Sequence, residues 1–529
     1  MKNKTICIFI LYATLCAFNE VKAQQGTWTL MHGTTLPNTD GDFGIKGVAS
    51  PTNNPPALYE AAEWTDHQGN FWIYGGLHPV AYSALWKFEP ATNMWTWVQG
   101  PDTAITYAVY GTKGVPDTAN NPGAHSFGAL TWTDLQNNLW LFGGANYDNY
   151  SLSDLWKYNI STNTWTWMSG PNTGDPPGSY GIMGTPSISN YPPNRSETNA
   201  SWVDANGNLW LFGGMGRIGG TIQKYNDLWR YDISTNMWTW MKGDSIGNSM
   251  GNYGVKGVPA ISNEPSGRCV YSKWKDADGN FWLFGGWGVN WGFFNDLWKY
   301  DLTTNMWTWI NGSNLLNDPG NYGTICNSTN TNCPVNRMEN KACWTDANNN
   351  FWLFGGLSDN NLQLIGLNDL WYYNVQQNQW TWVNGGTGPS ERNGAVSFYD
   401  SNGNLWVFGG QNVDNYGVKN YNDLWLYEPD TTCKALTTLV QTTTEPCPTK
   451  DCLVISPNPN NGIFNVQAAE DINDYSITIT DMFGRKVFYK TYMGSTPELI
   501  NISNQGNGLY IVLVSNKGTQ YRSKVFVNK

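Results

Sequence analysis

The 529-residue chain has few charged residues and very little histidine. Asp, Glu, Lys and Arg together make up 13% of it, and there are 4 His. The 41 acidic residues outnumber the 30 basic ones, which gives a formal charge of −11. Nucleic-acid binding is disfavoured, because phosphate contacts need basic patches. After the N-terminus no apolar run is long enough to cross a bilayer as a helix, so no transmembrane segment is expected.

Aromatic residues and glycine are abundant instead. Phe, Trp and Tyr make up 15% of the chain, and Trp alone occurs 30 times. This composition excludes an intrinsically disordered protein, because disorder needs few aromatic residues. The 57 Gly and 26 Pro predict frequent turns and few long helices.

Residues 1–23 have the pattern of a secretory signal peptide. Lys2 and Lys4 give a positive start, and the apolar run 5–18 is too short to span a bilayer. Small residues suited to cleavage follow in Val21-Lys22-Ala23. We therefore expect cleavage near Ala23 and export of the mature chain through the periplasm.

Residues 453–529 differ from the rest, because they contain no Trp and their apolar residues alternate in short runs between turns. This pattern predicts a small Ig-like β-sandwich. The segment also resembles the C-terminal sorting domain of type IX secretion cargo, through Ser456-Pro457-Asn458-Pro459, the run 480–485 and the run 508–512. The resemblance implies a Bacteroidetes-type cell, the type IX machinery as a partner, and a secreted or outer-surface location.

A unit of four short strands is repeated six times before this segment. An aromatic-Gly-Gly sequence ends the second strand of each copy, a Leu-Trp strand follows, and five copies then have Trp-Thr-Trp. Four-stranded units repeated in this way are the blades of a propeller, in which radial repetition protects the strand edges. The first glycines of the six copies are Gly75, Gly143, Gly213, Gly285, Gly355 and Gly409.

The sixth unit lacks its fourth strand, and a matching Thr27-Trp28-Thr29 sequence stands at the mature N-terminus. We therefore predict an all-β, six-bladed propeller over 24–429 that the N-terminal strand closes. A linker that contains Thr and Cys would span 430–452. The double glycine and the later Trp resemble the kelch-repeat propellers of the galactose-oxidase-like superfamily, which implies the same fold.

Long inserts of about thirty residues precede five of the six blades. They share an aromatic-Gly step, as in Phe43-Gly44 and Tyr180-Gly181, whereas the insert before the sixth blade is only 385–397. One interpretation is a collar on one face, whose gap leads to a binding site at the channel mouth. The other is that the inserts only cover sheet edges.

Two groups of residues are candidate ligand contacts. Trp287 and Trp291 lie outside the repeat template, in a glycine-flanked loop of the fourth blade, and suit stacking on a sugar or anchoring a partner protein. Packing against a neighbouring insert is the alternative. The second group recurs before the first strands and faces the predicted channel mouth, although in kelch propellers an Arg or His here joins neighbouring blades. Its members are Arg195, Arg268, Arg337, Arg392 and His125, with Glu60, Glu197, Glu339 and Glu391 nearby.

No catalytic constellation, metal site or cofactor motif is evident. A copper radical oxidase of kelch fold would need paired His ligands, and only His78 and His125 could meet. Disulfide candidates are Cys326 with Cys333, which bracket a short loop, and a pair in the linker that includes Cys447 or Cys452.

Three functions fit these features. The first is an exported binding module for a glycan or protein on the long-loop face. The second is an enzyme, similar to a sialidase or epimerase, acting on a glycan or sugar acid with the Arg and Glu residues. The third is a structural surface-layer component. Convergence of the Arg and Glu side chains in one pocket would favour the enzyme.

Overall fold

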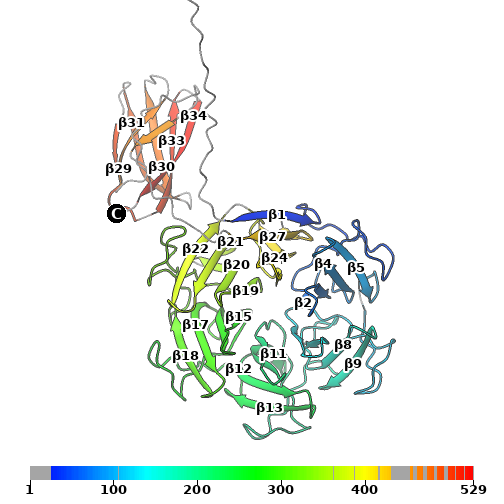
Figure 1. The fold of residues 1–529 in the computed structure, drawn as a ribbon. Coiled ribbons are helices and arrows are strands. Elements are labelled where there is room, and N and C mark those ends of the chain that lie inside the picture. Colours follow the sequence, from blue (N-terminus) through cyan, green and yellow to red (C-terminus); the bar gives the residue numbers. More distant parts are fainter. Residues whose placement is uncertain are drawn as a thin grey trace, which may run out of the picture. The chain divides into compact units, whose positions relative to one another are not determined.

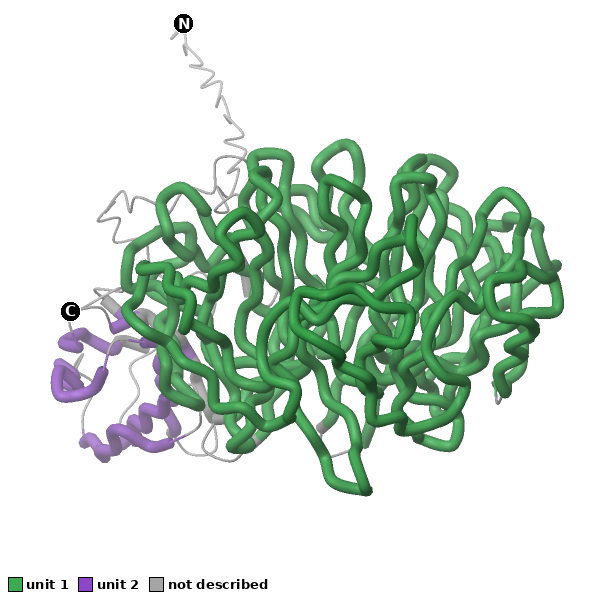
Figure 2. Tube along the Cα trace, turned by 90° about the horizontal axis from the view of Figure 1, so that it is seen from below, with its two compact units in different colours: residues 1–437 green, residues 438–529 purple. Residues whose placement is uncertain are grey.

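The computed structural model describes residues 26–104, 106–360, 363–385, 388–414, 417–429, 453–456, 462–468, 474–481, 485–493, 498–506, 508–516 and 519–527. Within these ranges the regular structure is all β-strand, without an α-helix. The chain forms two compact units, Met1–Thr437 and Thr438–Lys529, which Figure 2 colours separately.

Six antiparallel sheets of the first unit are arranged in a ring (Figure 1). The first blade contains β2 (Ala62–Thr65), β3 (Phe71–Tyr74), β4 (Leu85–Glu89) and β5 (Met94–Gln99). The second contains β6 (Leu130–Thr133), β7 (Leu139–Phe142), β8 (Leu155–Asn159) and β9 (Thr164–Ser169). The third contains β10 (Ser201–Val203), β11 (Leu209–Ile218), β12 (Thr221–Asp232) and β13 (Met237–Lys242).

The remaining three blades follow the same order from the channel outwards. The fourth contains β14 (Arg268–Cys269), β15 (Ser272–Lys275), β16 (Phe281–Gly288), β17 (Phe293–Asp301) and β18 (Met306–Asn311). The fifth contains β19 (Cys343–Thr345), β20 (Phe351–Asn360), β21 (Gln363–Asn374) and β22 (Gln379–Gly385). The sixth contains β23 (Val396–Tyr399), β24 (Leu405–Phe408), β27 (Leu424–Glu428) and β1 (Thr27–His32), beside a ribbon of β25 (Gln411–Asp414) and β26 (Gly417–Asn420).

The N-terminal strand closes the ring. β1 pairs antiparallel with β27, with Thr27 opposite Glu428 and Leu30 opposite Trp425. The Trp28 ring packs against Tyr427 of the same blade, with 4.9 Å between centroids, and at 5.1 Å against Phe354 of the fifth blade. The predicted six-bladed fold and its closure by the N-terminal strand are therefore confirmed.

An aspartate anchors the hairpin between the first and second strands of every blade. In the first blade, one oxygen of Asp66 accepts the backbone N–H groups of Gln68 and Asn70, and the other accepts Trp72 Nε1 at 2.8 Å. Such a turn satisfies backbone donors locally and ties a Trp of the second strand to it. The equivalent pairs are Asp134–Trp140, Asp204–Trp210, Asp276–Trp282, Asp346–Trp352 and Asp400–Trp406.

Tryptophans also join successive blades. Trp64 on the first strand of the first blade donates its indole N–H to the Trp140 carbonyl of the second blade at 2.9 Å. Trp132 does the same to Trp210, and Trp274 to Trp352. These rings are buried, so the repeated tryptophans form the core between blades and satisfy their polar atoms there.

The second unit is a small antiparallel sandwich around a core that includes Phe464, Ile477 and Val512. One sheet contains β28 (Leu453–Ser456), β29 (Ile463–Ala468) and β32 (Glu498–Asn501). The other contains β31 (Lys486–Tyr492), β30 (Tyr475–Asp481), β33 (Gly508–Asn516) and β34 (Thr519–Val527).

Candidate functional site in the central channel

The long inserts cover the outer edges of the blades. The insert before the third blade forms a bridge from Ser187 to Trp238 on the outermost strand β13, and its Tyr180 ring packs on Trp229 and Trp240 at 4.9 and 5.1 Å. These contacts agree with the interpretation that the inserts cover sheet edges, and not with a collar around the channel mouth. Equivalent bridges are Ser50–Trp95, Asp117–Trp165, Ala260–Trp307 and Thr329–Trp380.

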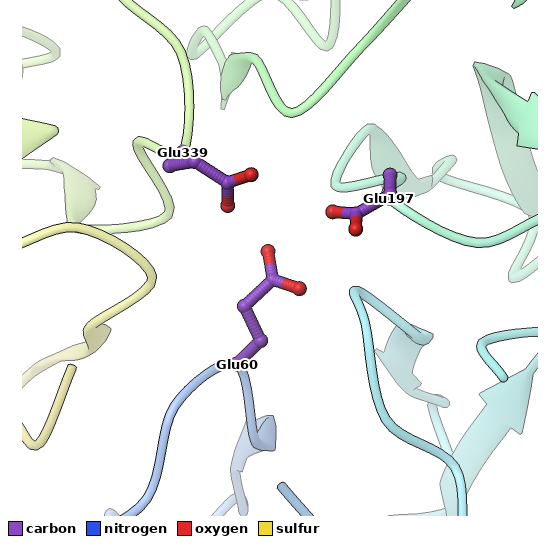
Figure 3. Close-up of side chains that lie close together, drawn as sticks. All are labelled: Glu60, Glu197 and Glu339. Atoms are coloured by element: carbon purple, nitrogen blue, oxygen red, sulfur yellow. The ribbon is translucent and has the colours of Figure 1, made fainter. Parts of the chain in front are cut away.

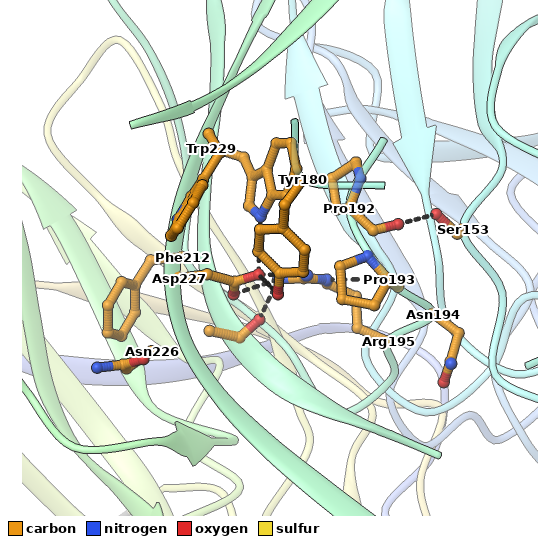
Figure 4. Close-up of polar contacts among 12 residues, drawn as sticks. Ser153, Tyr180, Pro192, Pro193, Asn194, Arg195, Phe212, Asn226, Asp227 and Trp229 are labelled. Carbon is orange, nitrogen blue, oxygen red and sulfur yellow. Dashed lines mark hydrogen bonds and ion pairs between the residues drawn. The ribbon is translucent and has the colours of Figure 1, made fainter. Parts of the chain in front are cut away.

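Arg195 forms a clamp between the second and third blades. Its guanidinium donates to both oxygens of Asp227 at 3.0 Å, and neither side chain is exposed. Asp227 also accepts the Tyr180 hydroxyl and Trp229 Nε1, each at 2.7 Å (Figure 4). The Arg195 backbone meanwhile bonds to Leu152 of the second blade. The arginine therefore holds two blades together, and Asp227 compensates its charge.

The same clamp recurs with small changes around the ring. In the second blade His125 replaces the arginine, with Nε2 3.6 Å from Asp154. The other arginines are buried beside their own aspartates, so the four guanidinium groups do not form one site. Their pairs are Arg268–Asp296, Arg337–Asp369 and Arg392–Asp423.

The first blade lacks the arginine, the aspartate and the tyrosine of this clamp, although the tryptophan is kept as Trp86. Leu58 stands in the place of the arginine, Ala84 in that of the aspartate and Phe43 in that of the tyrosine. Its backbone bonds are kept, since Leu58 N–H donates to the Tyr421 carbonyl at 2.9 Å, as Arg195 N–H does to Leu152. The joint replacement indicates that the polar residues serve one another rather than an external ligand.

The two predicted tryptophans of the fourth blade form a cluster with Lys224 of β12. Lys224 Nζ lies 3.4 Å from the ring centroid of Trp287 and 5.1 Å from that of Trp291, and it donates to the Gly288 carbonyl at 2.5 Å. Burial lowers the pKa of Lys224 to about 8. Trp287 is half-buried and already stacks on the lysine, whereas Trp291 is 66% exposed. Of the two tryptophans, Trp291 is therefore the exposed one.

Three glutamates converge on the channel axis (Figure 3). Glu60, Glu197 and Glu339 each stand two residues after the clamp position, in the first, third and fifth blades. A carboxylate oxygen from each lies within 4.8 Å of the others. The same position holds Phe127, Val270 and Gly394 in the second, fourth and sixth blades, so acidic and apolar residues alternate around the ring.

The backbone builds this convergence. The three glutamates have positive φ angles of 50°, 53° and 53°, which turn their side chains inwards. Hydrogen bonds link neighbouring copies of the position: Glu60 N–H donates to Gly394, Gly394 N–H to Glu339, and Val270 N–H to Glu197. A left-handed backbone conformation costs free energy for a residue other than glycine. The hydrogen bonds between neighbouring copies of the position stabilise this conformation.

Burial and mutual repulsion shift the pKa values of these acids upwards. Desolvation raises the pKa of Glu60, and desolvation followed by the charge of Glu60 raises those of Glu197 and Glu339 well above the usual range. Lys341 opposes the shift at Glu60 and Glu197. The Tyr59 hydroxyl bonds to Glu339, and its own pKa rises through burial and then through the charge of Glu339.

The innermost strands also line an open pocket of about 230 Å³. Lys341 Nζ, which lies at the pocket wall, is 3.0 Å from Glu63, and Lys273 donates to Ser201. Burial raises the pKa of the Cys343 thiol to about 11, so it is not a ready nucleophile. The lining residues are Glu63, Trp64, Thr65, Thr131, Trp132, Thr133, Lys273, Lys341, Cys343 and Ser397.

One disulfide prediction is wrong. Cys326 is disulfide-bonded, but Cys333 is a free thiol, so the two do not pair. Cys333 is instead turned inwards, where its Sγ lies 3.7 Å from the Asn295 carbonyl. Cys447 and Cys452 lie outside the described residues.

Two parts of the chain match known protein families. Residues 325–477 match the KLHDC2/KLHL20/DRC7 Kelch-repeats domain, a range that includes the fifth blade and strands β23, β24 and β27 of the sixth. The propeller is built of kelch repeats. Residues 454–528 match the secretion system C-terminal sorting domain, and they form the sandwich unit. Both predicted resemblances, to kelch propellers and to type IX cargo, are therefore confirmed.

The sorting domain supports export of the kelch propeller by the type IX system to the cell surface or beyond. The predicted signal peptide and its cleavage near Ala23 lie outside the described residues. In the part of the chain that the structure describes, no helix has the length and apolar character of a membrane span.

Sequence reasoning placed three of the acids near the channel mouth but did not foresee their convergence. Glu391, which was grouped with them, is exposed, whereas Glu60 is fully buried. The available signal was the alternation of Glu with apolar residues two positions after the Arg or His, or after Leu58 in the first blade. Only the ring closure turns that alternation into a single cluster.

Proposed function

We propose that the exported propeller is a binding module whose partner is a protein, and that Trp291 is an anchor of the interface. The observation that carries this is the exposure of Trp291 at the tip of the β16–β17 hairpin, supported from below by Lys224 and Trp287. An exposed large aromatic side chain on a rigid support is the kind of residue that dominates protein interfaces.

The surroundings of Trp291 extend the apolar surface. Leu315 of the next insert is also 66% exposed, and the adjoining Leu316 side chain packs close to Gly292 in the hairpin. The insert is tied to the hairpin where Asn317 N–H donates to the Phe293 carbonyl at 2.8 Å. Trp291 and Leu315 therefore belong to one supported surface on the long-loop side.

A protein partner fits this surface better than a sugar does. Sugar rings stack on open aromatic faces, and the face of Trp287 is taken by Lys224. Trp291 projects from its hairpin and would fill a pocket on a partner. The enzyme hypothesis receives less support, because the arginines on which it depended are buried in their clamps.

Site-specific photo-crosslinking in producing cells tests the proposal. A photoreactive phenylalanine analogue replaces Trp291 in one variant and Ile188, which is 83% exposed on another insert, in the control. We expect a protein adduct at position 291 and none at 188. The purified partner should then bind Trp291→Ala about 30-fold more weakly than wild type, as for a hot spot of about 2 kcal/mol.

Two results would count against this proposal. The first is an unchanged affinity of the Trp291→Ala variant for the crosslinked partner. The second is a glycan-array signal that Trp291→Ala abolishes, which would assign the surface to a carbohydrate instead.

A further inference from the structure

We propose that Glu60, Glu197 and Glu339 bind a divalent cation, Ca²⁺ by size and chemistry, on the axis of the propeller. Three carboxylates from three different blades meet there, with one oxygen of each within 4.8 Å of the others. The Glu60 and Glu339 side chains are buried, and Glu197 is half-buried. Carboxylate oxygens are the ligands that hard cations prefer.

Glu60 supplies an independent reason to expect a ligand. It is fully buried and points towards the other two acids (Figure 3), and within the described residues its carboxylate oxygens have no hydrogen-bond partner outside the carboxyl groups of Glu197 and Glu339. One oxygen each of Glu197 and Glu339 is unsatisfied in the same way. A buried carboxylate without a donor is costly unless a cation or a proton compensates it.

The protein's own cations do not supply the compensation. Lys341 is the lysine whose charge acts on Glu60 and Glu197. Its Nζ, however, lies 3.0 Å from a carboxylate oxygen of Glu63 and donates to the Ala61 carbonyl. The arginines of the adjoining blades are paired with their own aspartates. Three buried acids with one partly shared lysine leave a net negative charge, which a dication would neutralise.

The geometry favours Ca²⁺ over smaller or softer ions. For three atoms within 4.8 Å of one another, some point lies no more than about 2.8 Å (4.8/√3) from all of them, which is compatible with the ~2.3–2.6 Å of Ca²⁺–oxygen bonds. Mg²⁺ binds at about 2.0–2.1 Å in a near-ideal octahedron and usually keeps several waters, so it suits a site made only of protein carboxylates less well. Softer metals prefer sulfur or nitrogen, and burial followed by the charges of these acids keeps the pKa of the nearby Cys269 thiol high.

Binding should compete with protons. Carboxylate ligands bind a metal ion only when they are deprotonated, so protons compete with a cation for this site. The other titratable groups that act on the site are Tyr59, Glu63 and Lys341. The affinity for Ca²⁺ should therefore rise with pH.

The test uses the mature full chain, stripped with a chelator. Calorimetric titration with CaCl₂ at pH 7.5 should show one site, and added Ca²⁺ should raise the midpoint of thermal unfolding. Glu197→Gln and Glu339→Gln, which keep the side-chain shape, should each weaken Ca²⁺ binding by more than about 100-fold, beyond the 10–100-fold known for outer partners of metal ligands. The exposed control Glu391→Gln should bind as wild type.

The same variants separate lost binding from lost folding. Without Ca²⁺, Glu197→Gln and Glu339→Gln should be at least as stable as wild type, because each removes one repelling acid. Titration at pH 5.5 should give weaker binding than at pH 7.5. The proposal is overturned if wild type takes up no Ca²⁺ at millimolar concentration, which would leave protons as the compensation, or if the Glu197→Gln/Glu339→Gln double variant still binds.

Discussion

The clamp between blades can be tested by replacing clamp residues of the third blade with the residues that stand in their places in the first blade. Arg195→Leu alone removes the guanidinium that gives Asp227 two of its hydrogen bonds, at 3.0 Å each, inside a site without solvent exposure. Removing one partner of such a buried pair costs about 3–5 kcal/mol, because the other charge stays buried without compensation. Tyr180 and Trp229 still donate to Asp227, so we expect the lower half of this range.

The triple variant Arg195→Leu/Asp227→Ala/Tyr180→Phe reproduces Leu58, Ala84 and Phe43 of the first blade. It removes the ion pair together with the tyrosine, and it leaves Trp229 Nε1 without its acceptor, as Trp86 Nε1 is in the first blade. The backbone N–H bond at this position is the same in both blades. Replacing a complete buried ion pair by apolar side chains is often close to neutral. The triple variant should therefore recover to within about 2 kcal/mol of wild type.

Urea unfolding followed by tryptophan fluorescence measures both differences. The expected order of midpoints is wild type, then the triple variant, then Arg195→Leu. A triple variant as unstable as Arg195→Leu would refute the view that the three polar residues form one self-contained unit. A loss below about 1 kcal/mol in Arg195→Leu would refute the energetic argument itself.

Two further predictions follow from the pKa shifts of buried groups. Burial alone would raise the pKa of Asp369, but the charge of Arg337 and the hydrogen bonds from Arg337, Tyr322 and Trp371 together hold that pKa below the usual range. The stability from this pair is therefore present above the ordinary aspartate value of about 3.9 and is lost as the pH falls through the depressed value, so urea midpoints of wild type and Arg337→Leu should converge in acid but differ at pH 7. Burial also raises the pKa of the Cys343 thiol to about 11, so mass spectrometry should find it unmodified by iodoacetamide at pH 8 in the folded protein and alkylated after unfolding.

The kelch repeats and the sorting domain make one exported protein with separate tasks. The sandwich carries the address, and the propeller presents loops on a scaffold whose charged residues are largely committed to holding blades together. The two features for which we propose binding are the exposed Trp291 and the three converging acids. These two features are independent, and the experiments on Trp291 and on Glu197 can succeed or fail separately.

The sequence by itself determined the number of blades, their strand order and the closure of the ring. These follow from local patterns: the Gly-Gly pairs, the Asp-anchored turns that hold Trp72 and its equivalents, and the displaced Thr27-Trp28-Thr29 strand. Each pattern is either a short local motif or a motif repeated in phase along the chain. It can therefore be recognised without knowing which residues lie close together in the folded protein.

The tertiary structure decided which side chains meet. Arg195 finds Asp227, 32 residues later, and the inserts lie along the outer strands instead of around a channel mouth. Cys326 is disulfide-bonded, but not to Cys333, whose Sγ lies 3.7 Å from the Asn295 carbonyl. Glu60, Glu197 and Glu339 come together only because six blades close into a ring, which brings positions far apart in the chain to a single axis.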